Sequence, residues 1–552
     1  MGGQAIPLFD YYMAPGVLQT FKKHLKQQIF AMFDYEDIKD LLNVDKMDKL
    51  ISSQKHMDFD KHLLYVLIPK AADQERLKKN LDKCYNRAIA LTDRDTYQAM
   101  EALVANLNTM HSRCGAQVPF SSLNYGTDTS PEGRMVIKNL LLAEEAGLGD
   151  GETPIFPIAI FKVKEGVNYN PTDPNYDMLQ LACRVTSLRL FPNFAFLDAP
   201  FNKVFYKDGV PDSEVGYMGC RTRVMANVYN KRKEVISGRG NLSFTTVNLP
   251  RLGIKYGIAL GADKADMDGF FKELGEMCDL VKDQLLERYK LQAKKKVKNF
   301  PFLMGAGVWQ DSEKLNPEDT LEKVLKHGTL TIGVIGLSEC LIALTGKHHG
   351  ESPISQELGL LIVKFMREKC DSYCEKYKMN FSLIATPAEG LSGRFIKIDR
   401  ERFGLIPRVT DKEYYTNSNH VDVKYSISVK EKLAIEAPYH ELTNGGHIAY
   451  VELDGLTAAN PEAIMQVVRM MHDAGIGYGA INHPVDRDPV CGYTGIIGDV
   501  CPRCGRRDGE EVPLELVAKY KGSIYHHYKI ADKPNLFDPT TPNTLDVSDL
   551  EK

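Results

Sequence analysis

Strand-forming apolar runs alternate with long helical stretches along most of this chain, and this alternation limits the possible fold more than any other feature. Residues 155–163 (IFPIAIFKV) are apolar enough for a strand buried on both faces, as in parallel sheets. Further strand-like runs lie at 188–197, 242–249, 330–335, 381–385, 421–427 and 448–453, and helical stretches lie at 17–42, 71–107, 266–294, 355–378 and 461–474. The repetition predicts an α/β fold with a mainly parallel sheet, either open or closed into a barrel.

The composition excludes several classes of protein. The 552 residues carry a formal net charge of −4, which gives no general attraction to nucleic acid, whereas a mononucleotide substrate needs only a local pocket. No apolar run approaches the ~20 residues that span a bilayer, and the N-terminus lacks the features of a signal peptide. The eleven cysteines are mostly scattered, unlike those of secreted disulfide proteins, so we expect a reducing, cytoplasmic setting.

One cysteine stands in an unusual setting. The segment 217–223 (YMGCRTR) places Cys220 directly after a glycine, in a run that alternates between strand and turn character. A thiolate nucleophile is usually activated by a nearby histidine, and none lies beside Cys220 in the sequence. On its own, a cysteine of this kind is more often a buried structural residue than a functional one.

Other segments of the chain change that interpretation. Residues 111–122, 124–134, 191–202, 238–243 and 385–395, together with 217–223, resemble the signatures of the anaerobic (class III) ribonucleotide reductases, in the order of that family. The resemblance implies a ten-stranded α/β barrel of the ribonucleotide reductase and glycyl radical enzyme type, complete or not, over residues 1–480. Its N-terminal helical part would serve dimerisation and effector binding. A finger loop with Cys220 at its tip would thread the barrel.

The resemblance also implies a chemistry. Cys220 would become a transient thiyl radical that removes the 3′ hydrogen of a ribonucleoside triphosphate, after which the 2′ hydroxyl is lost and formate supplies the electrons. Asn241 falls where the family places an asparagine in the substrate and formate pocket, although by itself it is equally well a turn cap. The substrate phosphates would meet a helix N-terminus in the segment 385–394, with a binding set of Thr386, Glu389, Gly390, Ser392 and Arg394.

A short Gly/Pro/Cys-rich module at 481–511 resembles the family's zinc module. Cys491 precedes the pair Cys501 and Cys504, which has the CxxC–Gly form of a zinc knuckle. Structural zinc normally takes four ligands, and three cysteines stand here. Asp488 and His483 are the two candidates for the fourth ligand, and free cysteines without metal are the alternative.

Both ends of the chain depart from the family pattern. The segment 2–16 normally follows an upstream region that carries an ATP-cone, when present, and early barrel elements with a second active-site cysteine. The family's radical glycine normally lies shortly after the zinc module, in an Arg/Gly/Tyr motif. Gly522 is the only glycine after Gly509, and its surroundings do not match that motif, so the position of the radical glycine is unknown. Residues 512–552 form a divergent tail that we expect to be partly disordered.

The leading hypothesis is therefore an anaerobic ribonucleoside-triphosphate reductase. By resemblance its partners would be a second copy of the chain, ATP and deoxynucleotide effectors, and a radical-SAM activase with an iron–sulfur cluster. The alternative is a truncated or diverged paralogue that binds nucleotide, zinc or a partner without turnover. A glycyl radical lyase is a third hypothesis, and the nucleotide-type motifs at 124–134 and 385–394 argue against it.

Overall fold

The computed structural model of the chain describes residues 3–70, 73–110, 118–149, 151–219, 221–422, 425–454, 460–483, 486–495, 497, 500–507 and 544–546. Its strands largely follow the predicted α/β pattern. They are β1 (Gln4–Ile6), β2 (Ser121–Tyr125), β3 (Ile158–Val163), β4 (Asn193–Phe196), β5 (Tyr217–Met218), β6 (Thr222–Arg223), β7 (Asn241–Asn248), β8 (Thr329–Ile335), β9 (Asn380–Ala385), β10 (Ala449–Asp454), β11 (Tyr478–Asn482), β12 (Asp486–Arg487), β13 (Thr494–Gly495) and β14 (Thr544–Asp546).

The longer strands form one continuous row. Strands β1 to β4 pair in parallel, β4 pairs antiparallel with β11, and β11 pairs in parallel with β10. Strands β7, β8 and β9 form a second parallel sheet, and a bridge between Ile384 of β9 and Gly446, just before β10, joins the two sheets. The first sheet runs β1-β2-β3-β4-β11-β10-β14, with β14 parallel to β10, and the Gly446 bridge beside β10 continues the wall into the second sheet, β9-β8-β7. The predicted mainly parallel sheet is confirmed. Strands β1 to β4 run in one direction, and β11, β10, β9, β8 and β7 run in the opposite direction.

This row curls around a short ribbon made by β5 and β6. The N–H of Gly219 in the ribbon donates to Ser122 Oγ in β2 (2.8 Å). The N–H of Arg223 donates to the carbonyl of Gly445 (2.8 Å), whose own N–H binds β9. Because β2 and β9 are far apart in the row, so short a ribbon reaches both only if the strands wrap around it. The strands thus form a barrel-like wall with the ribbon residues 217–219 and 221–223 inside.

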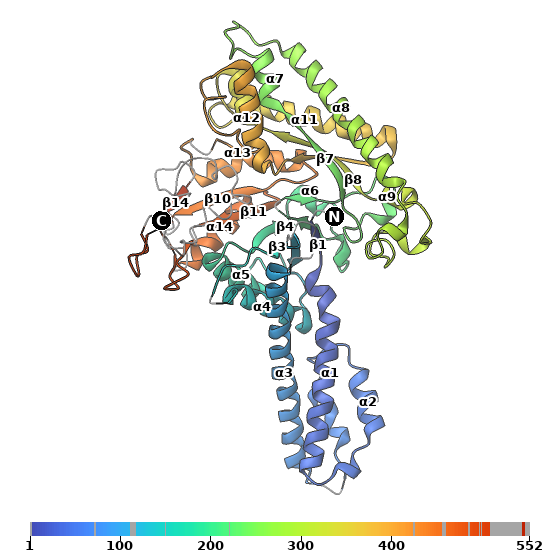
Figure 1. Cartoon of the computed structure of the whole chain (residues 1–552). Helices are drawn as coiled ribbons and strands as arrows, with labels where there is room; N and C mark the ends of the chain where they lie inside the picture. The colour runs from blue at the N-terminus through green and yellow to red at the C-terminus, as the bar shows by residue number, and fades with distance from the viewer. Residues whose placement is uncertain are drawn as a thin grey trace.

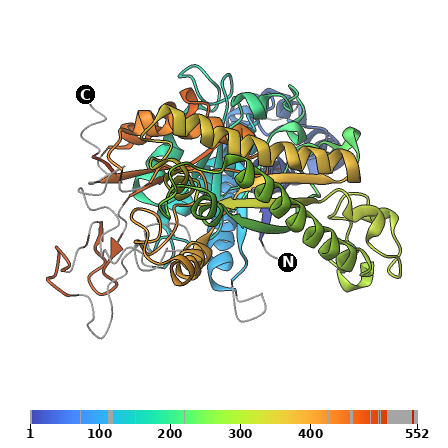
Figure 2. The same cartoon turned by 90° about the horizontal axis from the view of Figure 1, so that it is seen from above.

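Helices cover the outside of this wall (Figure 1). Seen from above, the long helices α8 and α11 lie side by side over β7, β8 and β9 (Figure 2). The helices are α1 (Phe9–Tyr35), α2 (Val44–Ser52), α3 (Gln74–Thr109), α4 (Pro131–Ala146), α5 (Tyr176–Leu188), α6 (Pro200–Lys203), α7 (Leu249–Tyr256), α8 (Met267–Ala293), α9 (Glu322–Leu325), α10 (Leu337–Thr345), α11 (Pro353–Tyr377), α12 (Glu389–Phe403), α13 (Val429–Leu442) and α14 (Pro461–Asp473).

Several helices begin where a capping side chain precedes a proline. Ser130 Oγ accepts the N–H of Gly133 at the start of α4, and Pro131 occupies the first turn. Ser352 and Pro353 start α11 in the same way, and Asn460 precedes Pro461 in α14. The cap satisfies an N–H that has no partner inside the helix, and proline has the backbone angle that the first turn needs.

The N-terminal helices α1, α2 and α3 project from the barrel as a stalk (Figure 1). Phe21, Leu25 and Ile29 lie four residues apart on α1 and are fully buried, which places them on one face, and α1 packs along α3. Helix α1 begins at Phe9 and includes Pro15, so the start predicted at residue 17 was too late.

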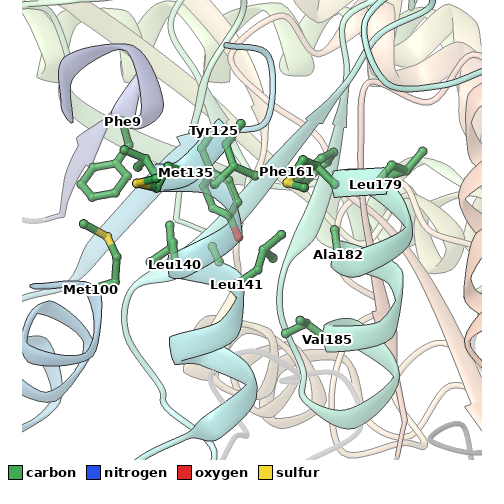
Figure 3. Packing of buried hydrophobic residues seen from close by; sticks show 14 of the residues in the cluster. Phe9, Met100, Tyr125, Met135, Leu140, Leu141, Phe161, Leu179, Ala182 and Val185 are labelled. Atoms are coloured by element: carbon green, nitrogen blue, oxygen red, sulfur yellow. The ribbon is translucent and has the colours of Figure 1, made fainter. Parts of the chain in front are cut away.

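The stalk joins the barrel through a continuous apolar core. Figure 3 shows Tyr125 of β2 and Phe161 of β3 facing Leu140 and Leu141 of α4 and Leu179 of α5. These side chains are fully buried. Burying each large apolar side chain stabilises the fold by about 1.5–3 kcal/mol. The packing keeps β2, with β3 beside it, fixed behind the ribbon that β2 contacts.

One strand prediction was wrong. The run 421–427 forms no strand among its described residues 421–422 and 425–427. Val421 is instead fully buried in a loop, where its N–H donates to Glu436 Oε1 of α13 (3.0 Å). The apolar and β-branched residues therefore reflect burial in that loop.

Within the described part of the chain, no helix is both long enough and apolar enough to cross a bilayer.

The close approach of two backbones gives a testable prediction. Gly446 has φ +130°, and a Cβ atom on it would lie 1.9 Å from the carbonyl oxygen of Arg221. Gly475 also has positive φ (+78°), but a Cβ there would meet no atom within 4 Å. We expect Gly446→Ala to lower the free energy of unfolding by at least about 2 kcal/mol more than Gly475→Ala, measured by urea titration. Equal losses would show that this contact does not hold the ribbon.

Candidate active site and metal centre

The two strands of the ribbon β5–β6, which lies inside the barrel-like wall, flank Cys220 in the sequence. Cys220 itself lies outside the described residues, and both of its neighbours are described. Gly219 has φ +58°, the left-handed region that favours glycine, and a Cβ on it would come within 2.8 Å of the Phe120 ring. The glycine before the cysteine therefore meets both a backbone and a space requirement of the turn.

One wall of the barrel holds the ribbon through β2 and β11. Asn124 of β2 donates from Nδ2 to the carbonyl of Tyr217 (2.9 Å), and its Oδ1 accepts the Tyr217 N–H (2.8 Å). The Asn124 side chain thus takes the place of a neighbouring strand for that residue. The hydroxyl of Tyr478 in β11 donates to the carbonyl of Gly219 (3.1 Å). These contacts fix the ribbon just before position 220.

The opposite wall holds the ribbon through Arg221. This side chain is fully buried. Its Nη1 donates to the carbonyls of Ala385 (3.3 Å) and Thr386 (3.2 Å) and to Asn417 Oδ1 (3.1 Å), and its Nη2 donates to the Tyr450 hydroxyl (3.3 Å). The residue after the candidate radical cysteine therefore reaches the end of β9, a polar loop and β10.

Sequence reasoning missed that polar loop, residues 414–420 (YYTNSNH). All seven residues are buried. The N–H and hydroxyl of Thr416 donate to Glu339 Oε1 (2.9 and 2.6 Å), and Ser418 Oγ donates to the Thr386 carbonyl (2.8 Å). A dense polar run between two helices was the available signal. Its burial depends on contacts that no local pattern contains.

The predicted phosphate-binding segment begins helix α12, as expected. Thr386 and Ser392 are buried, whereas Gly390 and Arg394 are exposed. Glu389 is the first residue of α12, and its side chain lies outside the described part of the structure. The helix has no side-chain cap, so its first N–H groups have no local side-chain acceptor. This arrangement can accept an anion at the helix N-terminus.

Asn241 is the first residue of β7 and is half-buried. Its Oδ1 atom is buried and has no hydrogen-bond partner among the described residues. A buried acceptor without a partner is costly, so a ligand that donates a hydrogen bond would stabilise it. The structure therefore leaves Asn241 able to bind a hydroxyl group.

The predicted metal ligands lie together. One ligand atom each from Asp488, Cys491, Cys501 and Cys504 lies within 4.8 Å of the others. The sulfurs of Cys491 and Cys501 are 3.6 Å apart, and Cys504 Sγ lies 3.0 Å from Asp488 Oδ2. Tetrahedral zinc, with bonds of about 2.3 Å to sulfur, separates its sulfurs by about 3.8 Å. The four residues fit such an ion.

The contacts of His483 and Asp488 distinguish these two candidates for the fourth zinc ligand. His483 is fully buried outside this group, and its Nε2 lies against the carbonyl of Thr186. Asp488 Oδ1 accepts hydrogen bonds from Arg506 (2.6 Å) and the N–H of Val490 (2.9 Å), which leaves Oδ2 toward the cysteines. Burial alone would raise the pKa of Asp488, but hydrogen bonds from Cys504, Val490 and Arg506 hold it well below its usual range.

The comparisons with known proteins agree with this geometry. The family model described as anaerobic ribonucleoside-triphosphate reductase matches residues 1–515. The anaerobic ribonucleoside-triphosphate reductase of Haemophilus influenzae is 31% identical over 490 residues, 87% of this chain and 65% of the relative. The Escherichia coli protein of that name is 33% identical over 454 residues, 80% of this chain and 61% of the relative. The chain belongs to the anaerobic ribonucleoside-triphosphate reductase family.

A solved structure supports the fold of this family member. The anaerobic ribonucleotide reductase from Thermotoga maritima, in complex with dATP and CTP, superposes with a TM-score of 0.53 at 16% identity, covering 93% of this chain and 90% of that one. At this identity the likeness concerns the fold alone. The chain spans somewhat less than two thirds of the length of the two bacterial relatives.

Buried histidines lie around the ribbon in this reductase-family chain. The rings of His440 and His447 are 4.1 Å apart, and His447 also neighbours His420 (5.3 Å). Burial lowers the pKa of His440 to about 3 and that of His349 to about 4. Burial, followed by the charges of neighbouring histidines and Arg221, lowers the pKa of His447 well below its usual value. His349, His440 and His447 are therefore neutral in the folded protein at neutral pH.

These neutral histidines predict how stability depends on pH. In the unfolded chain each has a pKa of about 6.5, so below that pH the unfolded state binds protons that the folded state does not. The contribution of these histidines to the free energy of unfolding is complete above about pH 6.5. It decreases as the pH falls toward the folded pKa of about 3. We expect His440→Gln to make the decline between pH 6.5 and 5 shallower by up to about 1.4 kcal/mol per pH unit in urea titrations. His62→Gln is the control, because the His62 side chain is 62% exposed. An equal pH slope in the two variants would contradict the conclusion that His440 is buried and neutral.

Proposed function

We propose that this protein reduces ribonucleoside triphosphates to 2′-deoxyribonucleotides in an anaerobic cytoplasm. The observation that carries the proposal is the ribbon β5–β6, whose described residues 217–219 and 221–223 are held from two sides of the barrel-like wall in a chain of this family. A wall of strands around the ribbon would keep water and oxidants from a sulfur radical formed there.

In this proposal the Cys220 thiyl radical takes the 3′ hydrogen of the ribose, and the 2′ hydroxyl leaves as water. Formate supplies two electrons and becomes carbon dioxide, and the 3′ hydrogen returns from the cysteine to the ribose. The overall balance is one ribonucleotide, one formate and one proton to one deoxyribonucleotide, one carbon dioxide and one water. A glycyl radical, when present, generates the thiyl radical. Its glycine is unknown here, because the sequence around Gly522 does not match the family's Arg/Gly/Tyr motif, and Gly522 lies outside the described residues.

The described residues support roles for substrate binding. The backbone N–H groups in the first turn of α12, where no side chain caps the helix, would bind phosphate, with Thr386, Gly390 and Ser392 lining the turn and Arg394 adding charge from the exposed face. The unpartnered Oδ1 of Asn241 would accept a hydrogen bond from a ribose hydroxyl. Donors for phosphate and an acceptor for hydroxyl are the set that a nucleotide requires.

The remaining predictions concern the whole protein. They are the tenth strand of the barrel, the homodimer, the radical-SAM activase with its iron–sulfur cluster, and regulation by ATP and deoxynucleotides. For an effector, the stalk offers a groove lined by Lys22, Lys23 and Lys26 of α1 and Ser52 of α2. Three lysines beside one groove would attract a triphosphate.

We also propose that zinc is the metal of the Asp488–Cys491–Cys501–Cys504 group. Three thiolates and one carboxylate are a tetrahedral donor set, and the exposed Cys504 and the buried Cys501 come from one CxxC turn. Zinc would cross-link segments that share only a small apolar cluster around Ile497 and Cys501. Its role there is structural.

Turnover in the presence of an activase tests the main proposal. The protein, a radical-SAM activase proven on another family member, S-adenosylmethionine and reductant are incubated anaerobically with formate and each ribonucleoside triphosphate, and deoxynucleotides are measured. We expect formate-dependent product that Cys220→Ser abolishes and Cys84→Ala retains, with nucleotide binding intact in both variants. A glycine-type electron paramagnetic resonance doublet that is lost in Gly522→Ala would locate the radical glycine.

The same assay contains the outcome that contradicts the proposal. Nucleotide binding by the folded protein, without a radical signal or product, would favour the non-catalytic paralogue. The sequence around Gly522, which does not match the family's radical motif, is the observation that motivates this second hypothesis.

Metal content tests the zinc assignment. We expect about one zinc per chain by mass spectrometry of the purified protein, because four ligands complete one tetrahedral site. Asp488→Ala should lower zinc retention during dialysis against a chelator by at least about tenfold, and His483→Gln should not change it. Loss of zinc in the histidine variant alone would reverse the choice of the fourth ligand.

A further inference from the structure

Three carboxylates surround one imidazole at the end of helix α14. His472 lies in the last turn of that helix, and Asp473 follows it directly. Glu165 comes two residues after β3, and Asp198 comes two residues after β4. Because β3 and β4 are parallel neighbours, their carboxyl ends bring Glu165 and Asp198 to the same edge of the wall. The group shares no residue with the sites proposed for catalysis, nucleotide or zinc.

One nitrogen of the His472 ring is already occupied. Nδ1 lies 3.2 Å from Asp473 Oδ1, and because a carboxylate only accepts, Nδ1 carries the proton of this hydrogen bond. The Tyr169 hydroxyl donates to the same oxygen (3.2 Å), and the Tyr169 and His472 rings stack with their centres 4.0 Å apart. In its neutral form, a ring held in this way presents a lone pair on Nε2. A ring N–H bound to a carboxylate is also the usual support of a metal-ligating histidine.

The other ring nitrogen faces two carboxylates without a hydrogen bond to either. Nε2 of His472 lies 3.6 Å from Asp198 Oδ2 and 3.8 Å from Glu165 Oε1. It is buried, and it has no hydrogen-bond partner among the described residues. The side chains of His472 and Asp198 are only 11% and 10% exposed. A buried polar atom without a partner is costly, so a ligand that binds Nε2 would stabilise this arrangement.

The spacing around Nε2 differs from that of the hydrogen-bonded pairs in this protein. The imidazole and carboxylate are 2.6 Å apart in His24–Asp95 and 2.7 Å apart in His327–Asp311. A tetrahedral metal ion with bonds of about 2.1 Å separates a nitrogen ligand from an oxygen ligand by about 3.4 Å. The distances at His472 are therefore closer to those between two ligands of one ion than to those of a hydrogen bond.

We propose that His472, Asp198 and Glu165 bind a divalent first-row metal ion, such as Mn²⁺ or Zn²⁺, with water completing its coordination. One imidazole and two carboxylates are donors that such ions accept. Glu165 is 54% exposed, so its side chain can turn toward an ion held by the other two residues. The ion would offset the negative charge and tie the end of α14 to the ends of β3 and β4, beside the pairing of β4 with β11.

A proton is the competing cation at this position. Burial alone would lower the pKa of His472, but the carboxylates of Asp198, Asp473 and Glu165 raise it above its usual value. A protonated Nε2 has no lone pair for a metal, so metal affinity should decrease as the pH falls. Binding is therefore measured at about pH 8, above the ordinary histidine pKa of about 6.5.

Titration of Mn²⁺ into the nucleotide-free full chain tests this site, with free Mn²⁺ followed by electron paramagnetic resonance. Mn²⁺ prefers oxygen and nitrogen ligands, so it leaves the cysteines of the Asp488 group to zinc. We expect Asp198→Asn and His472→Gln each to weaken Mn²⁺ binding by at least about tenfold. Asp473→Asn, which keeps an acceptor for Nδ1, should weaken it less. Asp198→Asn also keeps an acceptor for the Glu165 N–H (2.7 Å), so the loop is preserved.

His24→Gln is the matched control, because it removes an imidazole that is already hydrogen-bonded to a carboxylate. Its Mn²⁺ affinity should equal that of the unmodified protein. The inference is overturned if the folded, unmodified protein binds no Mn²⁺, which would leave a proton as the only cation at His472. It is also overturned if Asp198→Asn and His472→Gln bind Mn²⁺ as well as the unmodified protein, or if Asp488→Ala alone loses it.

Discussion

The contact between Gly446 and the backbone of Arg221 is the constraint on which the rest of the site depends. It brings the ribbon against the junction between β9 and β10, where the two sheets of the row are joined. A larger residue at 446 would separate the ribbon from that wall. The opposite wall is held by Asn124, whose amide binds both backbone groups of Tyr217. The ribbon is therefore fixed on both sides by groups with little freedom.

The ribbon is surrounded by polar groups that water does not reach. The loop 414–420 is buried, and a partly buried ion cluster supports it: the Lys412 ammonium lies 2.5 Å from Glu339 and 2.6 Å from Asp422. Glu339 in turn accepts hydrogen bonds from Thr416. In a medium of low polarity such interactions are stronger and depend more on geometry than in water. The polar groups around the ribbon are thereby held in place by the folded protein itself.

In the metal group, the two carboxylate oxygens of Asp488 have different partners. Asp488 uses Oδ1 to bind Arg506 and the backbone and directs Oδ2 to the cysteines. A cysteine at the same position would offer a single sulfur. The carboxylate can therefore take part in the metal group and in the loop around it, which has only a small apolar cluster of its own.

The family was predictable from short motifs along the sequence, and the α/β class and most long elements from periodic apolar runs and caps, because these signals act over a few residues. The spacing of the cysteines also marked the candidate metal ligands. The sequence misplaced the start of α1 and predicted a strand at 421–427, where buried loop residues resemble a strand. Which polar residues are buried around the ribbon, and which of Asp488 and His483 joins the cysteines, became clear from the folded structure. Those outcomes depend on how separate segments meet, as in the contacts of Arg221 with Asn417 and of His483 with Thr186, and no local pattern records them.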